Sequence, residues 1–320
     1  MRFLTQPLFR LVPDGTTIKF MRGRFAGLIV SAVLSTASVV LFFYPGLNLG
    51  IEFRGGVVMQ VRTPQPADFA KLRAALGGQH LGGAGLQRFG SNRDVLISLE
   101  SQRTAAATDQ AVQEVQAALA KAEPGAKVLS TNAVGASVSA QLFRNGLLAL
   151  GISLLMILVY IWFRFEWQFA VGAVVTLVLD MTKAIGFLAL TGIQFDLVMV
   201  AAILTVLGYS TNDKVVVYDR VRENLRKYKS MPLRDLIDLS INETLNRTLG
   251  TSMTVFLAAL PLALFGGASL SGFAIVMLFG IVVGTSSSIF IAAPILLFLG
   301  EHRLRRDAQA AKPAKQQPAR

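Results

Sequence analysis

Six apolar runs, each long enough to cross a lipid bilayer, constrain this chain more than any other feature of its sequence. A transmembrane helix needs roughly 20 mostly apolar residues. The runs lie at Phe25–Tyr44, Gly146–Phe163, Trp167–Leu190, Asp196–Tyr218, Arg247–Phe265 and Phe273–Leu299. The chain of 320 residues is 53% hydrophobic and only 16% charged, whereas an ordinary soluble domain carries roughly 25% charge. The sequence therefore predicts an α-helical polytopic membrane protein with six transmembrane helices.

Lysine and arginine are distributed unevenly around these runs, and this bias predicts the orientation of the chain in the membrane. Basic residues gather before the first run, between the fourth and fifth, and after the sixth, whereas the connections TGIQF and GGASLSG carry none. We therefore expect a cytoplasmic N-terminal segment at 1–24 and a basic, disordered cytoplasmic tail at 301–320. The same topology accounts for the net charge of +12, so we expect no nucleic-acid partner, which would need a basic face on a water-soluble domain.

The segment 45–141, between the first run (25–44) and the second, has the alternating patterns of a folded domain on the outer side of the membrane. GGVVMQVR, GAGLQRFG, RDVLISL and AKVLSTNAVG have strand patterns, and PADFAKLRAAL and TAAATDQAVQEVQAALAKA have helix patterns. Their order along the chain is βαββαβ, the split βαβ arrangement. The sequence thus predicts one extracytoplasmic α+β, ferredoxin-like domain between transmembrane helices 1 and 2, with helices 2–6 in 142–300.

The fourth apolar run is interrupted by the stretch STNDK, which places Asn212, Asp213 and Lys214 at membrane depth. A charged side chain there costs roughly 2.5–3.5 kcal/mol on insertion scales and usually faces protein or a water-filled cavity. Spacings of three and four residues put Asp213 on one helix face with Tyr209 and Ser210. We therefore expect this face to meet other protein rather than lipid.

Two neighbouring runs carry further polar groups. Asp180 and Lys183 have the i,i+3 spacing of an ion pair, which is either structural or functional, and Arg247 shares a helix face with Thr251. Arg247 either faces protein or extends to the cytoplasmic surface. Asp213 either takes part in ion transfer or is a structural residue neutralised by a basic side chain, for which the candidates are Lys183, Lys214 and Arg247.

Two other stretches predict how the helices pack. Lys229–Leu245 is amphipathic, so a cytoplasmic segment at about 219–246 either lies on the membrane surface or docks against the spans. In the sixth run, Gly280 and Gly284 are followed by TSSS, and small residues at this spacing suit close helix contact.

Enzyme classes find little support in the sequence. The only histidines are His80 and His302, both outside the apolar runs, and the chain has neither a His-Glu-x-x-His motif nor a phosphate-binding loop. Asp180 and Asp213 could form an aspartyl protease dyad, but nearby lysines favour two ionised carboxylates over a shared proton. We therefore expect no enzymatic activity, no catalytic residue, no cofactor and no metal site.

Five motifs give the chain a family resemblance. They are LNLGIEFRGG, VGASVSAQL, AAILTVLGYSTNDKVVVYDRVREN, NETLNRTLGTSMT and GIVVGTSSSIFIAAPIL. Through them the sequence resembles the SecF family of protein-export membrane subunits, within the resistance–nodulation–division (RND) superfamily. The motif residues singled out are Gly50, Glu52, Phe53, Gly55, Gly56, Gly208 and Arg220. The chain departs from the usual family pattern at Glu52, Arg54, Ala136 and Leu179, which leaves the role of the Glu52 loop open.

The resemblance implies a function. A SecF subunit pairs with SecD in the bacterial cytoplasmic (inner) membrane and uses the proton motive force to assist the SecYEG translocon and SecA. Its further partners would be the exported unfolded polypeptide and membrane lipid. Asp213 and Arg247 match polar residues of the family's proton path at the SecD interface, and we group Asn212, Asp180 and Thr251 with them. The alternatives are an RND-type transporter of lipids or small molecules, and a scaffold without proton coupling.

Overall fold

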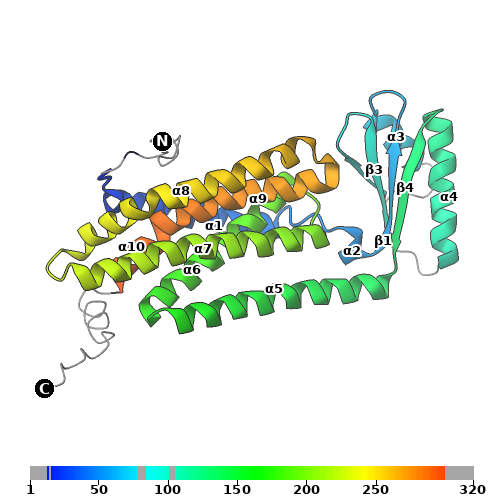
Figure 1. Cartoon of the computed structure of the whole chain (residues 1–320). Helices are drawn as coiled ribbons and strands as arrows, with labels where there is room; N and C mark the ends of the chain where they lie inside the picture. Colours follow the sequence, from blue (N-terminus) through cyan, green and yellow to red (C-terminus); the bar gives the residue numbers. More distant parts are fainter. Residues whose placement is uncertain (1–12, 14–15, 78–83, 101–104, 300–320) are drawn as a thin grey trace, which may run out of the picture.

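The computed structural model describes residues 13, 16–77, 84–100 and 105–299. The expected tail at 301–320, most of the N-terminal segment 1–24, and both histidines lie outside the described residues. Within them, a bundle of long helices carries a small domain of strands and helices at one end (Figure 1).

Six helices in the described part of the chain are long and apolar enough to span a membrane, which confirms the prediction of a multi-pass membrane protein. A 3₁₀ turn at Phe20–Gly23 leads into the first, and the last continues through a π-helical turn, Ser288–Ala292, into α10, Ala293–Phe298. The helices are α1 (Arg24–Phe43), α5 (Ala136–Arg164), α6 (Trp167–Thr191), α7 (Leu197–Lys227), α8 (Leu233–Phe265) and α9 (Gly267–Ser287). Helix α5 begins inside the range 45–141 that we expected for the outer domain.

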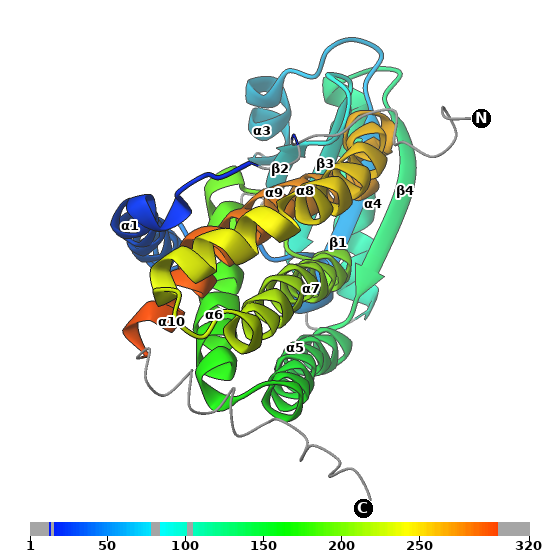
Figure 2. The same cartoon turned by 60° about the vertical axis from the view of Figure 1, so that its left-hand side comes forward.

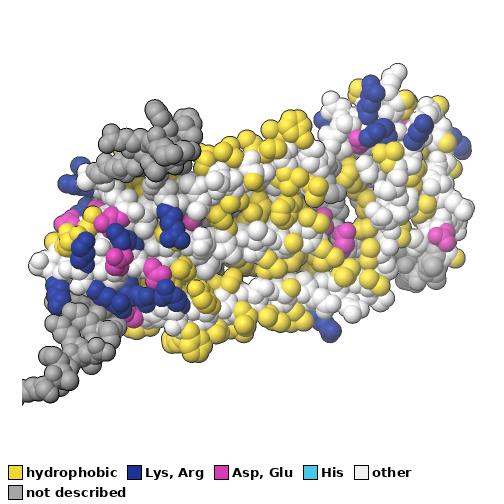
Figure 3. Space-filling model, in the orientation of Figure 1, with side chains coloured by type: hydrophobic (Ala, Val, Ile, Leu, Met, Phe, Trp, Pro, Cys, Tyr) yellow, Lys and Arg dark blue, Asp and Glu magenta, His cyan; other side chains and the backbone are white. Residues whose placement is uncertain are grey.

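Burial divides the helices into an inner and an outer set. In their most apolar stretches, α6, α7 and the α9–α10 span are 50%, 56% and 61% buried, against 17%, 17% and 6% for α1, α5 and α8. Figure 2 shows α1 and α5 on opposite sides of the bundle, and both contact α6. Hydrophobic side chains cover the flank of the bundle in Figure 3, as expected for a surface that faces lipid.

Small residues permit the close helix contacts. On α1, Ser31, Ser35 and Ser38 are buried while large apolar side chains point outward. A Cβ added at Gly186 of α6 would collide with Ser38. Membrane helices associate through close packing of small residues and not through the hydrophobic effect. Helix α1, with small residues inside and large apolar residues outside, therefore has the pattern of a helix bordered by lipid.

The expected βαββαβ domain is present. It contains β1 (Gly56–Arg62), α3 (Phe69–Gly77), β2 (Gly85–Arg88), β3 (Asp94–Glu100), α4 (Ala105–Ala122) and β4 (Lys127–Val134). The strand order is β2-β3-β1-β4 with every neighbouring pair antiparallel, the order of a split βαβ sheet. Apolar side chains of β1 and β3 pack against α3 and α4 on one face of the sheet, so alternation along the strands decides which residues form this core.

A four-residue helix that the sequence patterns did not predict, α2 (Ile51–Arg54), joins the bundle to β1. After it, Gly55 and Gly56 have φ values of 74° and 127°, and a Cβ at Gly56 would collide with the Leu99 carbonyl of β3. Only glycine fits this conformation and this contact without strain. The two glycines therefore turn the chain sharply from α2 into the sheet.

Just before α2, the chain is hydrogen-bonded to the start of α7. The Phe195 amide donates to the Asn48 carbonyl at 2.7 Å, and the Gly50 amide donates to the Phe195 carbonyl at 2.8 Å. This parallel bridge between Leu49 and Phe195 is followed at once by Asp196, whose carboxylate accepts from the Met199 amide and caps α7. Segments 146 residues apart in sequence are thus joined through their backbones.

The amphipathic segment docks against the bundle rather than lying apart from it. Helix α7 runs on to Lys227 and α8 starts at Leu233, so most of the range 219–246 belongs to these two long helices. The apolar face of the segment joins the bundle core through Leu233, Leu236, Ile237, Ile241 and Leu245.

Candidate functional site

Asp213 lies near the middle of α7 with its side chain buried between α8 and α9. Its Oδ2 accepts a hydrogen bond from the Thr285 hydroxyl of α9 at 3.2 Å. Thr285 lies 2.7 Å from the Ser252 hydroxyl of α8, which in turn accepts from the Tyr209 hydroxyl at 2.6 Å. The Asp213 carboxyl group is therefore the end of a chain of three hydroxyl groups contributed by three helices.

No lysine or arginine of the described residues forms an ion pair with Asp213. Lys183 and Lys214 both contact Asp180 instead, and Arg247 is exposed on the surface of α8. None of these three side chains therefore forms an ion pair with Asp213 in this structure, and Lys214 acts on it only at longer range.

A second polar cluster lies on another side of α7 and is centred on Asp180 of α6. Its Oδ2 accepts hydrogen bonds from Ser210 at 2.8 Å, Lys214 at 2.9 Å and Ser287 at 2.7 Å. The Lys183 ammonium is 3.7 Å from Oδ1, so the predicted i,i+3 pair is present but Lys214 is the closer cation. Lys214 also donates to both the hydroxyl and the carbonyl of Ser210. One carboxylate thus serves two buried lysines.

The π-helical turn follows directly after Ser287, the α9 member of this cluster. Such turns interrupt the regular ladder of helix hydrogen bonds and are frequent at functional sites. Here the Ala292 carbonyl at the end of the turn accepts from the Tyr218 hydroxyl at 3.1 Å. A side chain of α7 therefore satisfies a backbone group in the irregular part of the sixth span.

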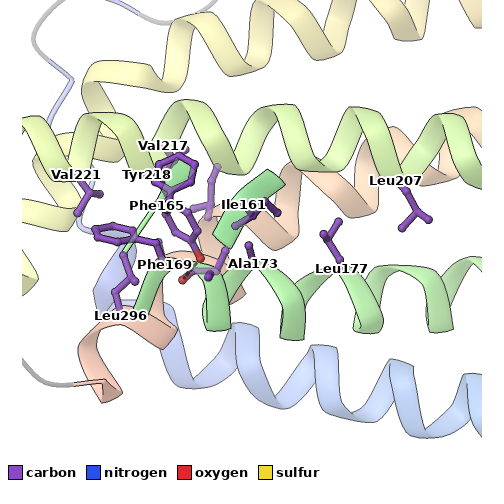
Figure 4. Close-up of a cluster of buried hydrophobic side chains, with 14 of the residues drawn as sticks. Ile161, Phe165, Phe169, Ala173, Leu177, Leu207, Val217, Tyr218, Val221 and Leu296 are labelled. Carbon is purple, nitrogen blue, oxygen red and sulfur yellow. Dashed lines mark hydrogen bonds between the residues drawn. The ribbon is translucent and has the colours of Figure 1, made fainter. Parts of the chain in front are cut away.

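Apolar side chains fill the bundle on one side of both polar clusters. Figure 4 shows Tyr218 and Val221 of α7 packed among Phe165, Phe169 and Leu296. The Tyr218 ring makes edge contacts with both phenylalanines, at centroid distances of 6.1 and 5.2 Å. This apolar plug packs on the side of α7 that faces α6, whereas Asp213 contacts Thr285 of α9.

Three of the candidate residues lie on the outer surface of the bundle instead of beside Asp213. Gly208 and Asn212 are exposed on α7, and Arg247 is exposed on α8. Thr251 is partly buried and its hydroxyl donates to the Arg247 carbonyl at 3.0 Å. Gly208 and Asn212 are four residues apart, so they form one stripe of small and polar groups on the face of α7.

Arg220 has a structural position at the basic end of the bundle. Its guanidinium contacts Glu243 of α8 and Glu223 of α7, each at 2.7 Å, and Asn224 donates to the same Glu243 carboxylate. These contacts join α7 to α8 beside a groove of about 340 Å³ that Arg247 also lines. The groups are partly exposed, so the geometry indicates helix alignment and no contact with Asp213.

The other family-motif residues lie at the base of the outer domain. Gly50 is hydrogen-bonded to Phe195, and Phe53 packs against the Phe195 ring at 5.4 Å. Glu52 lines a cavity of about 880 Å³ between the sheet and the adjoining helix ends. Asp213 lies 16 residues beyond Leu197, the first residue of α7, which is about 24 Å of helix rise. Gly50, Glu52 and Phe53 therefore shape the connection to the outer domain and do not contact the buried carboxyl group.

Sequence reasoning missed Ser252 as a member of the site and treated Thr285 and Ser287 of the TSSS stretch only as packing residues. Single hydroxyl residues in a membrane helix usually bond to their own backbone or fill small spaces, so they carry little signal. The one signal in the sequence was the position of Ser252 next to Thr251, which is one of the predicted site residues.

The comparisons with known proteins agree with each other. The model of "Protein export membrane protein SecD/SecF, C-terminal" matches residues 114–302, and that of the "SecD/SecF GG Motif" matches residues 40–67. Proteins named "Protein translocase subunit SecF" from Cereibacter sphaeroides and Rickettsia felis are 44% and 41% identical. The alignments cover 92% and 93% of this chain and 93% and 96% of those proteins.

Solved structures give the same result. The crystal structure of SecDF from Thermus thermophilus, described as a translocon-associated membrane protein, matches with a TM-score of 0.82 at 32% identity. That match covers 92% of this chain and 40% of the SecDF chain. A structure of SecDF in a super-membrane-facing form matches with a TM-score of 0.61 at 29% identity and covers 41% of its chain. This chain therefore corresponds to about two fifths of a SecDF molecule.

Proposed function

The chain belongs to the SecD/SecF family of protein-export membrane proteins, and from this membership we propose that it uses the proton motive force, together with a SecD partner, to promote export of polypeptides. Its general role is that of a multi-pass accessory subunit in Sec-dependent protein export. The proton coupling, the assistance to SecYEG and SecA, and the contact with unfolded polypeptide are the proposal. So is the absence of an enzymatic reaction.

The observation that carries proton coupling is the environment of Asp213. This carboxyl group is buried in the span, accepts from a neutral hydroxyl, and forms no ion pair among the described residues. A neighbouring cation holds a carboxylate in its charged form. Because the adjacent Lys214 pairs with Asp180 and not with Asp213, Asp213 can exist either protonated or ionised, as a proton-carrying residue must.

The exposed polar stripe supports a partner within the membrane. Asn212 and Arg247 offer hydrogen-bonding groups that hydrocarbon cannot satisfy, and Gly208 leaves space for close approach. A second helical half, as in the SecDF chains of which this chain matches about two fifths, would cover them. Movement of that half against this stripe would change the packing of the helix that carries Asp213, and such a change would couple proton transfer to conformation.

The proposed orientation places both termini in the cytoplasm and the βαββαβ domain outside the inner membrane. In Figure 3, lysines and arginines gather at the end of the bundle opposite the domain. Cytoplasmic loops carry an excess of these residues. Anionic lipid at that surface would attract the same cations.

The test of proton coupling is Asp213→Asn in cells depleted of the native protein. Asp219→Asn is the matched control, because Asp219 is on the same helix but pairs at the surface with Arg164 and Arg222. We expect Asp213→Asn to lose the export of a periplasmic reporter that depends on the proton motive force, and Asp219→Asn to retain it. Normal export by the Asp213→Asn variant at normal protein levels would contradict proton coupling through Asp213.

Partnership is tested separately by purification of the chain from native membranes in mild detergent. Recovery of SecD, alone or with translocon subunits, is the expected result. Recovery of an outer-membrane channel or periplasmic adaptor without SecD would favour a transporter of lipids or small molecules.

A further inference from the structure

The three hydroxyl groups that end at Asp213 form a continuous hydrogen-bonded chain. The successive oxygen–oxygen distances are 2.6 Å from Tyr209 to Ser252, 2.7 Å from Ser252 to Thr285, and 3.2 Å from Thr285 to the carboxylate. Each oxygen belongs to a different side chain, and the chain alternates between α7, α8 and α9 before it returns to α7. Such an arrangement depends on the packing of three helices and not on one local sequence.

The direction of the hydrogen bonds along this chain is fixed by counting protons. A hydroxyl group has one proton to donate. Thr285 donates its proton to Asp213, so it accepts from Ser252, and Ser252 accepts from Tyr209. Ser252 and Thr285 therefore each accept one hydrogen bond and donate one, between the donor Tyr209 and the acceptor Asp213, which is the arrangement that lets a proton pass by exchange of bonds.

The chain leads from Asp213 toward the outer domain. Tyr209 is four residues nearer to the start of α7, about 6 Å of helix rise, and its side chain is only partly buried. In the opposite direction, apolar side chains around Tyr218 and Val221 pack on the α6 side of α7 (Figure 4), and Arg220 and Arg247 line a groove between α7 and α8. Of these two directions from Asp213, the hydroxyl chain runs in only one.

We propose that Tyr209, Ser252 and Thr285 are the relay that carries protons between Asp213 and the outer-domain side of the membrane. This inference rests on the proposed proton coupling. It adds the route that the proton takes to Asp213 and the side of the membrane from which it enters. A proton that reaches Tyr209 from the outer-domain side binds to its oxygen, and Tyr209 passes its own proton to Ser252. Ser252 then protonates Thr285, and Thr285 protonates Asp213 Oδ2. One O–H bond forms for each that breaks, and rotation of the three hydroxyl groups afterwards restores the starting directions of the hydrogen bonds.

The structure also explains why these residues differ from ordinary packing hydroxyls. Thr205 and Thr211 on the same helix donate to carbonyl groups one turn back, which satisfies them without any neighbour. Tyr209, Ser252 and Thr285 bond across helices to one another instead. The Thr251 hydroxyl is a further neighbour of Tyr209, although it donates to its own helix.

The experiment measures proton flux into proteoliposomes that contain the chain purified with its SecD partner, under an imposed pH gradient and with a pH-sensitive dye inside. Thr285→Val removes the hydroxyl at constant volume, Thr285→Ser keeps it, and Tyr209→Phe removes the first hydroxyl while keeping the ring. Asp213→Asn is the reference for loss of coupling. Export of a precursor protein is recorded for the same variants.

We expect Thr285→Val and Tyr209→Phe to lower flux by roughly a hundredfold, the loss typical of a positioned proton-transfer group, and Thr285→Ser to restore most of it. The residual flux should show a larger slowing in heavy water than wild type. A structural role alone predicts equal loss in the Val and Ser variants or none, so either result overturns the relay. Because Tyr209 is only partly buried, Tyr209→Phe keeps the test available if Thr285→Val does not fold.

The reference variant separates the two proposals. If Asp213→Asn abolishes flux while Thr285→Val and Tyr209→Phe retain it, the relay is wrong and proton coupling stands. If Asp213→Asn itself conducts protons and exports normally, proton coupling through Asp213 is wrong, and the relay is wrong with it.

Discussion

Replacement of Asp180 by asparagine should be among the most destabilising changes of a polar residue in the bundle. The substitution keeps the shape of the side chain but removes the carboxylate that faces both Lys214, at 2.9 Å, and Lys183, at 3.7 Å. All three side chains are nearly inaccessible, with 1–5% of their surface exposed. The variant would leave two ammonium groups in the membrane interior without their shared counter-ion.

The size of the effect follows from that geometry. Removal of one partner from a buried ion pair costs about 3–5 kcal/mol, and we expect Asp180→Asn to fall in this range. Lys214→Met should cost less, about 1–3 kcal/mol, because Asp180 keeps Lys183 and two hydroxyl donors. Asp219→Asn breaks an ion pair that is more than a third exposed on both sides, so it should cost about 1 kcal/mol or less.

The assay is equilibrium unfolding of the purified chain in mixed micelles with increasing SDS, followed by the fluorescence of its two tryptophans. The expected order of stability loss is Asp180→Asn, then Lys214→Met, then Asp219→Asn. If Asp180→Asn costs no more than Asp219→Asn, or less than Lys214→Met, the assignment of Asp180 as the shared counter-ion is refuted.

Two further predictions concern a helix contact and the outer domain. A Cβ at Gly280 would collide with the Val206 side chain, so Gly280→Ala should lower the free energy of unfolding by about 1–3 kcal/mol. Gly250→Ala, with nothing within 4 Å, should be neutral or slightly stabilising in the same assay. In the sheet, Arg62 holds the pKa of Asp94 below its usual 3.8, so their contact stabilises the domain above that pH and is lost as the pH falls through the lowered pKa. Hydrogen exchange of the β1 and β3 amides, corrected for intrinsic rates, should show this acid loss in wild type and a weaker pH dependence in Asp94→Asn, and an equal dependence in both would contradict it.

The sequence predicts element types well wherever one period dominates. Alternation identified the four strands, and the length of the apolar runs identified six spans, because both patterns record which side chains face core, lipid or water. Helix α2 was missed because four residues are too few for any period to show. The end of α7 was placed too early and the start of α8 too late, because charge marks the edge of the membrane, whereas a helix continues as long as its backbone bonds and packing do.

The site was only half predictable for a similar reason. Charges in an apolar run are conspicuous, so Asp180, Asp213 and Lys214 were found. Which of these side chains contact one another depends on how α6 and α7 are rotated about their axes. That relative rotation cannot be predicted from the sequence of either helix alone. The selection of Thr251 in place of Ser252 shows the same limit, since one residue is a rotation of 100° about the helix axis and moves a hydroxyl from the surface to the interior.

The backbone bridge between Leu49 and Phe195 has a mechanical consequence. It fastens the chain that enters the sheet to the first residues of the helix that carries Asp213, by hydrogen bonds of 2.7 and 2.8 Å. A tilt or axial slide of α7 would therefore pull on α2 directly, and the turn at Gly55 and Gly56 would convert that pull into a swing of the whole sheet. A movement of α7 around its buried carboxyl group would therefore reach the outer domain through backbone hydrogen bonds as well as through side-chain packing.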